Sequence, residues 1–255
     1  MRKPLFVGNW KAGMSVTDAE NYLKEAEKFS AEWKHEVVIL PSYLCLDTMK
    51  RHNTTKILLG AQDVSQESGV TYTGEIPATN LYNMGCKYAL VGHTDRRARG
   101  ETNQAVNKKI LSCLASGITP IVCIGEDLNE YNQNRTREVV EKQLRECLVG
   151  VRQIENIVIA YQPVWSIGTG HQIAVDYIAL IADYIRKTVR DITKDPMSVH
   201  FTLLFAGGPI TGATARGFLE TPGIDGLMST IASMKVGTFN EIINTKFEVK
   251  RSMLE

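Results

Sequence analysis

Four polar residues in this chain have side chains that could carry out chemistry on a small molecule: Asn9, Lys11, His93 and Gln162. The lysine offers a positive charge, and the imidazole can donate a hydrogen bond or exchange a proton near neutral pH. A carboxamide differs from a carboxylate because it has no lone pair basic enough to take a proton from carbon. These residue types can therefore bind and polarise a small polar ligand, but Gln162 cannot itself act as a base.

All four residues lie shortly after short apolar runs, which are typical of buried strands. Eight such runs recur along the chain: Leu5 to Val7, Val37 to Leu40, Ile57 to Leu59, Tyr88 to Val91, Ile121 to Ile124, Ile157 to Tyr161, Phe201 to Phe205 and Gly226 to Met228. Most of the stretches between them are longer and polar, with apolar residues at three- and four-residue steps that indicate amphipathic helices. Examples are Asp18 to Lys28, Thr102 to Ala115, Arg135 to Leu148 and Ala174 to Val189.

Strands that are apolar on both faces and alternate with helices predict a parallel sheet covered by helices. Eight such units favour a closed (β/α)8 barrel, and a length of 255 residues is typical of that fold. An open dinucleotide-binding sheet would be favoured by a GxGxxG turn after the first strand, but residues 8–13 read Gly-Asn-Trp-Lys-Ala-Gly. Since no linker rich in Pro and Ser divides the chain, residues 1–255 are predicted to form a single α/β domain.

In such a barrel, chemistry takes place at the C-terminal ends of the strands. The residues expected there are Asn9, Lys11, His93, Glu126, Gln162, Gly207, Gly208, Ser229, Thr230 and Ile231. A cation, an imidazole and an amide should therefore converge on one mouth. No group of histidines has the spacing of metal ligands, so no metal is expected.

The bulk composition is that of a globular protein with a sizeable core. With 44% hydrophobic residues and a formal net charge of +1, the chain has no electrostatic bias toward nucleic acid or an anionic membrane. No run approaches the ~18 apolar residues of a membrane helix, and the N-terminal apolar stretch is too short for a signal peptide. The five widely spaced cysteines suggest neither disulfides nor zinc, which favours the cytoplasm.

Motifs spread over nearly the whole chain resemble the triosephosphate isomerase family. The matching segments are Gly8-Asn9-Trp10-Lys11, Gly60-Ala61-Gln62, Tyr72-Thr73-Gly74-Glu75, Val91-Gly92-His93-Thr94-Asp95-Arg96-Arg97, Cys123-Ile124-Gly125-Glu126 and Pro163-Val164-Trp165 to Gly170. The resemblance implies a (β/α)8 TIM barrel that interconverts glyceraldehyde 3-phosphate and dihydroxyacetone phosphate without a cofactor. It also implies a place in glycolysis and gluconeogenesis, and a sugar phosphate as ligand.

The resemblance also implies roles for individual residues. It assigns substrate contacts to Asn9 and Lys11, and assigns to His93 the electrophile that donates to the substrate oxygens. Asp95 stands where the family has a glutamate, and Glu126 matches a carboxylate behind the site. Further residues align with the flexible loop and the phosphate loops of the family: Gly168, Gly207, Gly208, Pro209, Thr230 and Ile231. The Thr73-Gly74-Glu75 segment matches the loop through which the family forms a homodimer, with Arg96 matching an ion-pair partner of the glutamate.

The chain departs from the family pattern in three parts of the site. Gln162 occupies the position of the catalytic glutamate, while its neighbours are unchanged. Ala206 replaces a tyrosine that helps to hold the closed loop, and Pro209 replaces a serine whose backbone N–H a proline lacks. Thr230 and Ile231 replace two glycines whose backbone approaches the phosphate.

Three functions therefore stay open at the level of sequence, and whether the protein is an enzyme stays open with them. It could be an isomerase of the family type with impaired activity. It could be a catalytically inactive protein with a binding or regulatory role, or an isomerase of a different, unphosphorylated substrate. The departures at the base, the loop latch and the phosphate loops favour altered activity.

Overall fold

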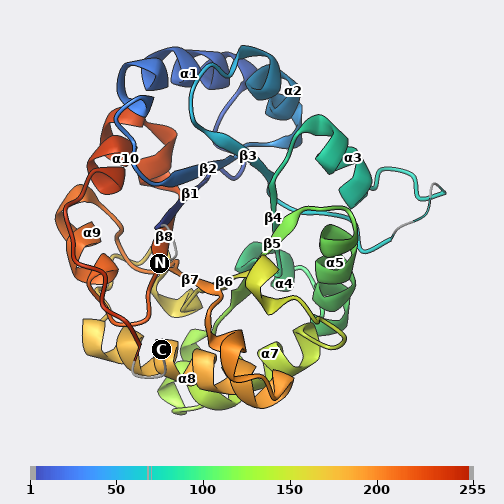
Figure 1. The fold of residues 1–255 in the computed structure, drawn as a ribbon, viewed down its shortest axis with the longest axis vertical. Coiled ribbons are helices and arrows are strands. Elements are labelled where there is room, and N and C mark those ends of the chain that lie inside the picture. Colours follow the sequence, from blue (N-terminus) through green and yellow to red (C-terminus); the bar gives the residue numbers. More distant parts are fainter. Residues whose placement is uncertain (1–3, 68, 70, 253–255) are drawn as a thin grey trace.

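The computed structural model describes residues 4–67, 69 and 71–252, in which eight parallel strands close into a barrel (Figure 1). The strands are β1 (Leu5–Asn9), β2 (Glu36–Leu40), β3 (Leu58–Ala61), β4 (Tyr88–Val91), β5 (Thr119–Ile124), β6 (Val158–Tyr161), β7 (Thr202–Phe205) and β8 (Gly226–Ser229). Each strand pairs with the next in sequence, and β1 closes the ring by pairing with β8. The fold is the predicted single-domain (β/α)8 TIM barrel, and the predicted domain bounds, residues 1 and 255, lie outside the described residues.

Helices surround the strands on the outside of the ring (Figure 1). The α-helices are α1 (Val16–Ser30), α2 (Tyr43–His52), α3 (Ala78–Met84), α4 (Thr94–Arg97), α5 (Asn103–Ala115), α6 (Leu128–Asn132), α7 (Thr136–Cys147), α8 (Val175–Thr193), α9 (Gly212–Leu219) and α10 (Val236–Ile243). Short 3-10 helices are η1 (Ile154–Asn156), η2 (Val164–Ser166), η3 (Pro196–Val199) and η4 (Ile231–Met234). The four helices predicted from periodicity correspond to α1, α5, α7 and α8.

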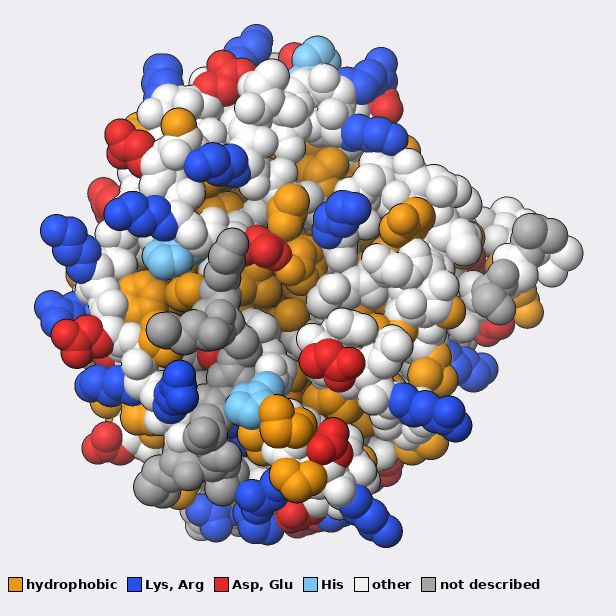
Figure 2. Space-filling view, in the orientation of Figure 1, with side chains coloured by type: hydrophobic (Ala, Val, Ile, Leu, Met, Phe, Trp, Pro, Cys, Tyr) orange, Lys and Arg blue, Asp and Glu red, His pale blue; other side chains and the backbone are white. Residues whose placement is uncertain are grey.

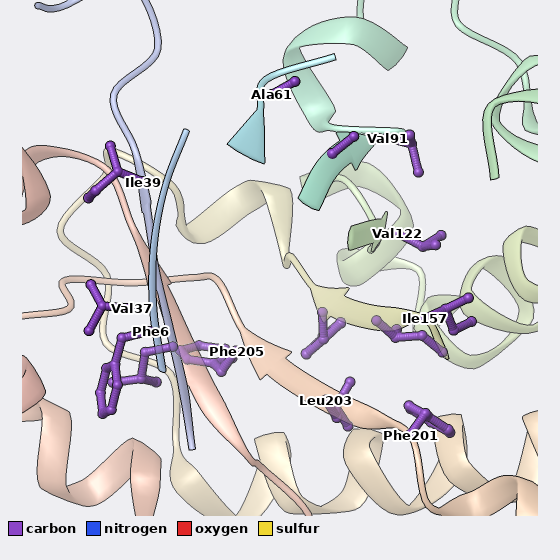
Figure 3. Packing of buried hydrophobic residues seen from close by; sticks show 14 of the residues in the cluster. Phe6, Val37, Ile39, Ala61, Val91, Val122, Ile157, Phe201, Leu203 and Phe205 are labelled. Carbon is purple, nitrogen blue, oxygen red and sulfur yellow. The ribbon is translucent and has the colours of Figure 1, made fainter. Parts of the chain in front are cut away.

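The core has two layers, and this explains why the strands are apolar throughout. Side chains such as Val7 and Leu204 fill the inside of the barrel, whereas Phe6 and Leu203 pack against the helices. Figure 3 shows part of the outer layer, with Phe6 and Phe205 among the side chains that lie between sheet and helices. Since neighbouring residues of one strand face opposite layers, neither face tolerates a polar side chain until the strand reaches the mouth.

The observed strand ends differ from the predicted ones by at most two residues, and β4 has the predicted bounds. Asn9 is the last residue of β1, where it pairs with Leu40 of β2, and Ser229 is the last residue of β8. Pairing with a neighbouring strand extends both strands past their last apolar residue. The polar residues Asn9 and Ser229 are thereby held by the sheet itself.

The surface agrees with a chain of nearly balanced charge. Figure 2 shows acidic and basic side chains interspersed over one face of the molecule. All five cysteines are free and buried, as expected for small core residues. Among residues 4–67, 69 and 71–252, none of the helices has the length and apolar character of a membrane span.

Candidate active site

The C-terminal ends of the strands surround a cavity of about 630 Å³. Eleven of the residues predicted from the sequence line it: Asn9, Lys11, His93, Gln162, Gly168, Gly207, Gly208, Pro209, Ser229, Thr230 and Ile231. They come from β1, β4, β6, β7 and β8 or the loops that follow these strands. The fold therefore brings together residues separated by more than 200 positions in the sequence.

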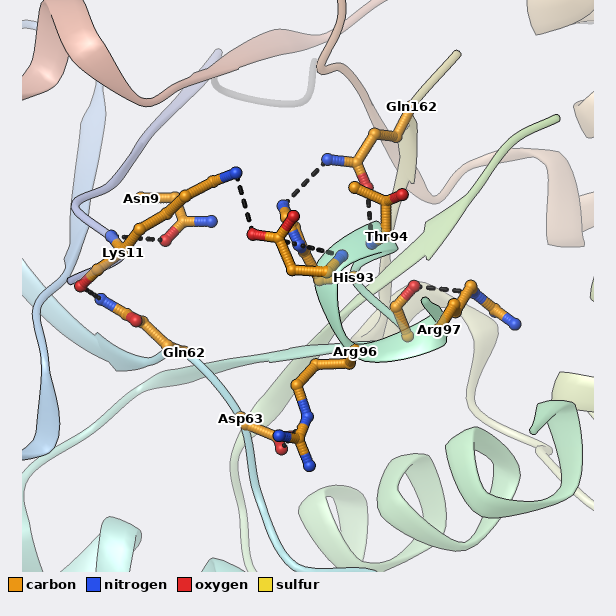
Figure 4. Close-up of polar contacts among 11 residues, drawn as sticks. Asn9, Lys11, Gln62, Asp63, His93, Thr94, Arg96, Arg97 and Gln162 are labelled. Carbon is orange, nitrogen blue, oxygen red and sulfur yellow. Dashed lines mark hydrogen bonds and ion pairs between the residues drawn. The ribbon is translucent and has the colours of Figure 1, made fainter. Parts of the chain in front are cut away.

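Backbone contacts hold Lys11 in place just after β1. Its backbone N–H donates to Oδ1 of Asn9 at 3.1 Å, and Nε2 of Gln62 donates to its carbonyl oxygen at 2.7 Å. Lys11 has a φ of 48°, in the left-handed region that a residue with a Cβ rarely adopts. The contacts with Asn9 and Gln62 hold this strained backbone, and the ammonium group points toward His93 (Figure 4).

The ammonium group of Lys11 forms an ion pair with Asp95, with 2.9 Å between Nζ and Oδ2. Partial burial raises the pKa of Asp95, but hydrogen bonding to Lys11 and the nearby His93 outweigh it and bring the pKa below its ordinary value. Asp95 is half exposed and does not line the cavity. It therefore acts on the site by holding Lys11.

His93 caps the short helix α4 at the end of β4. Its Nδ1 accepts a hydrogen bond from the backbone N–H of Asp95 at 3.1 Å. Burial lowers the pKa of His93 to about 4, with Lys11 also lowering it and Asp95 raising it. The imidazole is therefore neutral near pH 7, and the contact at Nδ1 favours the tautomer with its proton on Nε2.

The side chain of Gln162 lies directly against this imidazole (Figure 4). Its Nε2 lies 2.9 Å from Nε2 of His93, while its Oε1 accepts from the backbone N–H of Thr94 at 3.2 Å. Gln162 is 4% exposed, and its own N–H donates to Ile124 O at 2.7 Å. The amide is held by its neighbours and contributes no basic group to the cavity.

Glu126 is fully buried and does not line the cavity. Its carboxylate accepts hydrogen bonds from the Tyr161 hydroxyl at 3.1 and 3.2 Å and from Nε1 of Trp165 at 2.9 Å. Burial raises its pKa despite these bonds. Glu126 positions Trp165, at the start of the loop after β6, and lies behind the cavity lining rather than at the mouth.

The loop after β6 is fastened to the turn after β7 through Ser166. The Ser166 hydroxyl donates to Pro163 O at 2.7 Å and accepts from the backbone N–H of Gly208 at 3.0 Å. A Cβ on Gly207 would lie 2.7 Å from Cγ of Pro163 and 2.8 Å from Oγ of Ser166, so only glycine fits there. This latch was missed in the sequence, because nothing in the local pattern distinguishes Ser166 from a solvent-facing serine.

Thr230 and Ile231 begin the short helix η4 after β8. The Ser233 hydroxyl donates to Thr230 O at 2.7 Å, and Nε1 of Trp10 donates to Ser233 O at 3.0 Å. These bonds fix the backbone of the turn. The Ile231 side chain is nevertheless 81% exposed at the rim of the cavity.

Comparison with known proteins agrees with this geometry. Residues 4–246 match the family model for triosephosphate isomerase. A triosephosphate isomerase of Thermoanaerobacter pseudethanolicus is 36% identical over 248 residues, which cover 96% of this chain and all of the relative. The chain belongs to the triosephosphate isomerase family. A second relative with that name, from Geobacter metallireducens, is 36% identical over 252 residues, covering 96% of this chain and all of that relative.

A solved structure of this family has the same fold. The crystal structure of triosephosphate isomerase from Bartonella henselae matches with a TM-score of 0.85 and 26% sequence identity, over 96% of this chain and 99% of that one. The family assignment therefore rests on both sequence and structure.

The cavity of this triosephosphate isomerase family member has further lining residues that the sequence analysis missed. They are mainly apolar or hydroxyl-bearing, and they include Ile167, Ile210, Thr211, Met228, Thr238 and Glu241. Glu241 lies on α10, at a position whose helical pattern gives no sign that it faces the mouth. Within the described chain, no group of His, Cys, Asp and Glu is arranged to hold a metal ion.

Proposed function

We propose that this member of the triosephosphate isomerase family binds a small polar ligand in the mouth of its barrel, without isomerising triose phosphates at an appreciable rate. The observation that carries the proposal is the contact at 2.9 Å between the Gln162 amide and His93. Aldose–ketose isomerisation by proton transfer requires a base that takes a proton from carbon. The amide at this position cannot do so.

Asp95, Glu126 and His93 are poor substitutes for the missing base. Asp95 is paired with Lys11 and lies outside the cavity lining, and Glu126 is sequestered by Tyr161 and Trp165. The pKa of His93, about 4, makes it a poor proton acceptor at neutral pH. The loss of general-base catalysis alone lowers a rate by roughly 10²- to 10⁴-fold.

The test is a coupled assay of the purified protein with glyceraldehyde 3-phosphate, run beside Gln162→Glu and Gln162→Glu/Lys11→Ala. We expect the native protein to be at least about 10²-fold slower than Gln162→Glu, and the double variant to lose the rate gained. Native turnover within tenfold of Gln162→Glu would show that the amide is not limiting. If neither protein turns over the substrate, restoring the base is not enough, and the altered phosphate loops prevent recognition of triose phosphates as well.

A second candidate is an isomerase of an unphosphorylated substrate. It is favoured by Asn9, Lys11 and His93, which stay arranged around the cavity although the residues that would surround a phosphate have changed. A panel of unphosphorylated aldoses, with products separated by chromatography, distinguishes it from a binding role. Product that forms with the native protein and not with Lys11→Ala would support this second function.

We also propose that the protein is a cytoplasmic homodimer. Thr73, Gly74 and Glu75 are exposed in the segment that projects between β3 and α3 (Figure 1), and Leu44 on α2 is 84% exposed. Arg96, which the resemblance pairs with the glutamate, contacts Asp63 of its own chain at 2.9 Å. Light scattering should give a molecular mass of twice the 28.4 kDa of one chain. Leu44→Glu should lower this mass, whereas Leu128→Glu on α6 should leave it unchanged.

A further inference from the structure

We propose that the ligand of this cavity is an unphosphorylated hydroxycarbonyl compound with an aliphatic tail. The proposal deepens the proposed function, because it names the class of molecule that the same mouth binds. It rests on how polar and apolar groups are distributed around the barrel. Its experiment measures binding and is independent of turnover.

Most of the apolar side chains of the cavity lie on one side of the barrel. Asn9, His93 and Gln162 stand at the ends of β1, β4 and β6. The loop after β6 and the ends of the adjacent strands β7 and β8 supply these apolar side chains, beside the polar Thr211, Ser229 and Thr230. The main apolar side chains are Ile167, Pro209, Ile210, Met228 and Ile231. A ligand that fills both sides needs a polar head and an apolar tail.

The turn after β7 has few donors left for an anion. The backbone N–H of Gly208 is already bonded to Oγ of Ser166 at 3.0 Å. Pro209, the next residue, has no N–H at all. Two consecutive residues that line the cavity therefore offer no amide hydrogen to a phosphate, whereas the Pro209 ring can pack against an alkyl chain.

The charges around the cavity also disfavour a phosphate. The positive charge of Lys11 is shared with Asp95 at 2.9 Å, and His93 is neutral near pH 7. Glu241 adds a carboxylate to the cavity wall close to Gly212. A doubly charged phosphate near Glu241 would meet an unfavourable negative charge, whereas an uncharged hydroxycarbonyl head would meet hydrogen-bonding groups.

The size of the cavity and the exposure of Ile231 support a tail. A volume of about 630 Å³ lies within the range of sites that hold molecules considerably larger than a triose. Ile231 is 81% exposed at the rim, so an alkyl chain lying against it would remove apolar surface from water. Each methylene group buried in this way strengthens binding by about fourfold.

The experiment is an NMR binding titration of the native protein with three probes: hydroxyacetone, 1-hydroxy-2-hexanone and dihydroxyacetone phosphate. The first two share a head and differ by three methylene groups, so we expect 1-hydroxy-2-hexanone to bind at least about tenfold more tightly. Dihydroxyacetone phosphate should bind more weakly than 1-hydroxy-2-hexanone. Ile231→Ala should remove most of the gain from chain length and leave hydroxyacetone binding within about twofold.

Leu128→Ala is the matched control, because Leu128 is an exposed aliphatic residue outside the cavity lining. It should leave the order of the three affinities unchanged. The proposal is overturned if chain length brings no gain, if dihydroxyacetone phosphate binds most tightly, or if Ile231→Ala behaves like Leu128→Ala. These readings come from binding alone, so they are separate from the turnover assay that tests the proposed function.

Discussion

The amide nitrogen of Gln162 and Nε2 of His93 lie 2.9 Å apart, and both atoms are donors in the tautomer that the rest of the site favours. Rotating the amide by 180° would turn Oε1 toward His93. It would also turn the amide nitrogen toward the backbone N–H of Thr94, which now donates to Oε1 at 3.2 Å, so two donors would face each other there instead. A proton on Nδ1 would resolve the contact at Nε2 but would face the N–H of Asp95, with Oδ2 of Asp95 at 3.5 Å as its acceptor. The surroundings of position 162 therefore suit a carboxylate, which could accept from both Thr94 and His93.

We expect Gln162→Glu to raise the pKa of His93 above its present value of about 4, because a neighbouring carboxylate stabilises the imidazolium form. NMR titration of the His93 ring nitrogens measures this directly. Gln162→Met, which is neutral and of similar length, is the control and should not raise the pKa. An equal rise in both variants would mean that the pKa responds to packing rather than to charge.

Unfolding measurements should show that His93 makes the protein less stable in acid. Its folded pKa of about 4 is below the ordinary value of 6.5, so the unfolded chain binds the proton more readily. The contribution of the neutral, buried imidazole to the free energy of unfolding is therefore fully present above pH 6.5. This contribution, roughly 3 kcal/mol, is lost as the pH falls toward 4. Urea unfolding of native protein and His93→Asn at pH 7 and pH 4.5 checks this. A pH dependence that is the same in both proteins would contradict it.

Gly207→Ala should lower the free energy of unfolding by about 1–3 kcal/mol, because the new Cβ would lie 2.7 Å from Pro163 and 2.8 Å from Ser166. Gly237→Ala is the matched control: a Cβ there meets nothing within 4 Å, and the residue lies in helix α10. The control should be neutral or more stable by up to about 1 kcal/mol. Thermal or urea unfolding compares the two, and similar losses in both would refute the close contact at Gly207.

Ser166→Ala should release the turn after β7 from the loop after β6. The substitution removes the acceptor of the Gly208 N–H at 3.0 Å, a bond worth about 1 kcal/mol. Amide hydrogen exchange at Gly208 should therefore become about five times faster. The Gly125 N–H, which donates to Oε1 of Gln143 at 2.8 Å, is the internal control and should keep its rate. Unchanged exchange at Gly208 would show that the hydroxyl does not hold the turn.

The barrel could be predicted from the sequence because its signals are local. Eight apolar runs alternate with amphipathic stretches, and a strand that is buried on both faces must be apolar throughout. The positions of Asn9, His93 and Gln162 followed from the same pattern, since each stands where an apolar run stops. The side-chain contacts among them depend on which strands lie together at the mouth.

Only the tertiary structure decided how these residues act on one another. His93 and Gln162 are 69 positions apart, and their contact depends on the geometry of β4 and β6 across the barrel. Ser166 and Gly208, 42 positions apart, meet because the loop after β6 folds over the turn after β7. The identity of a residue sets which hydrogen bonds and charges it can offer, whereas the closure of the barrel sets which partners receive them. The sequence therefore determined the fold and the chemical groups of the site, and packing over long separations decided their hydrogen bonds, protonation and exposure.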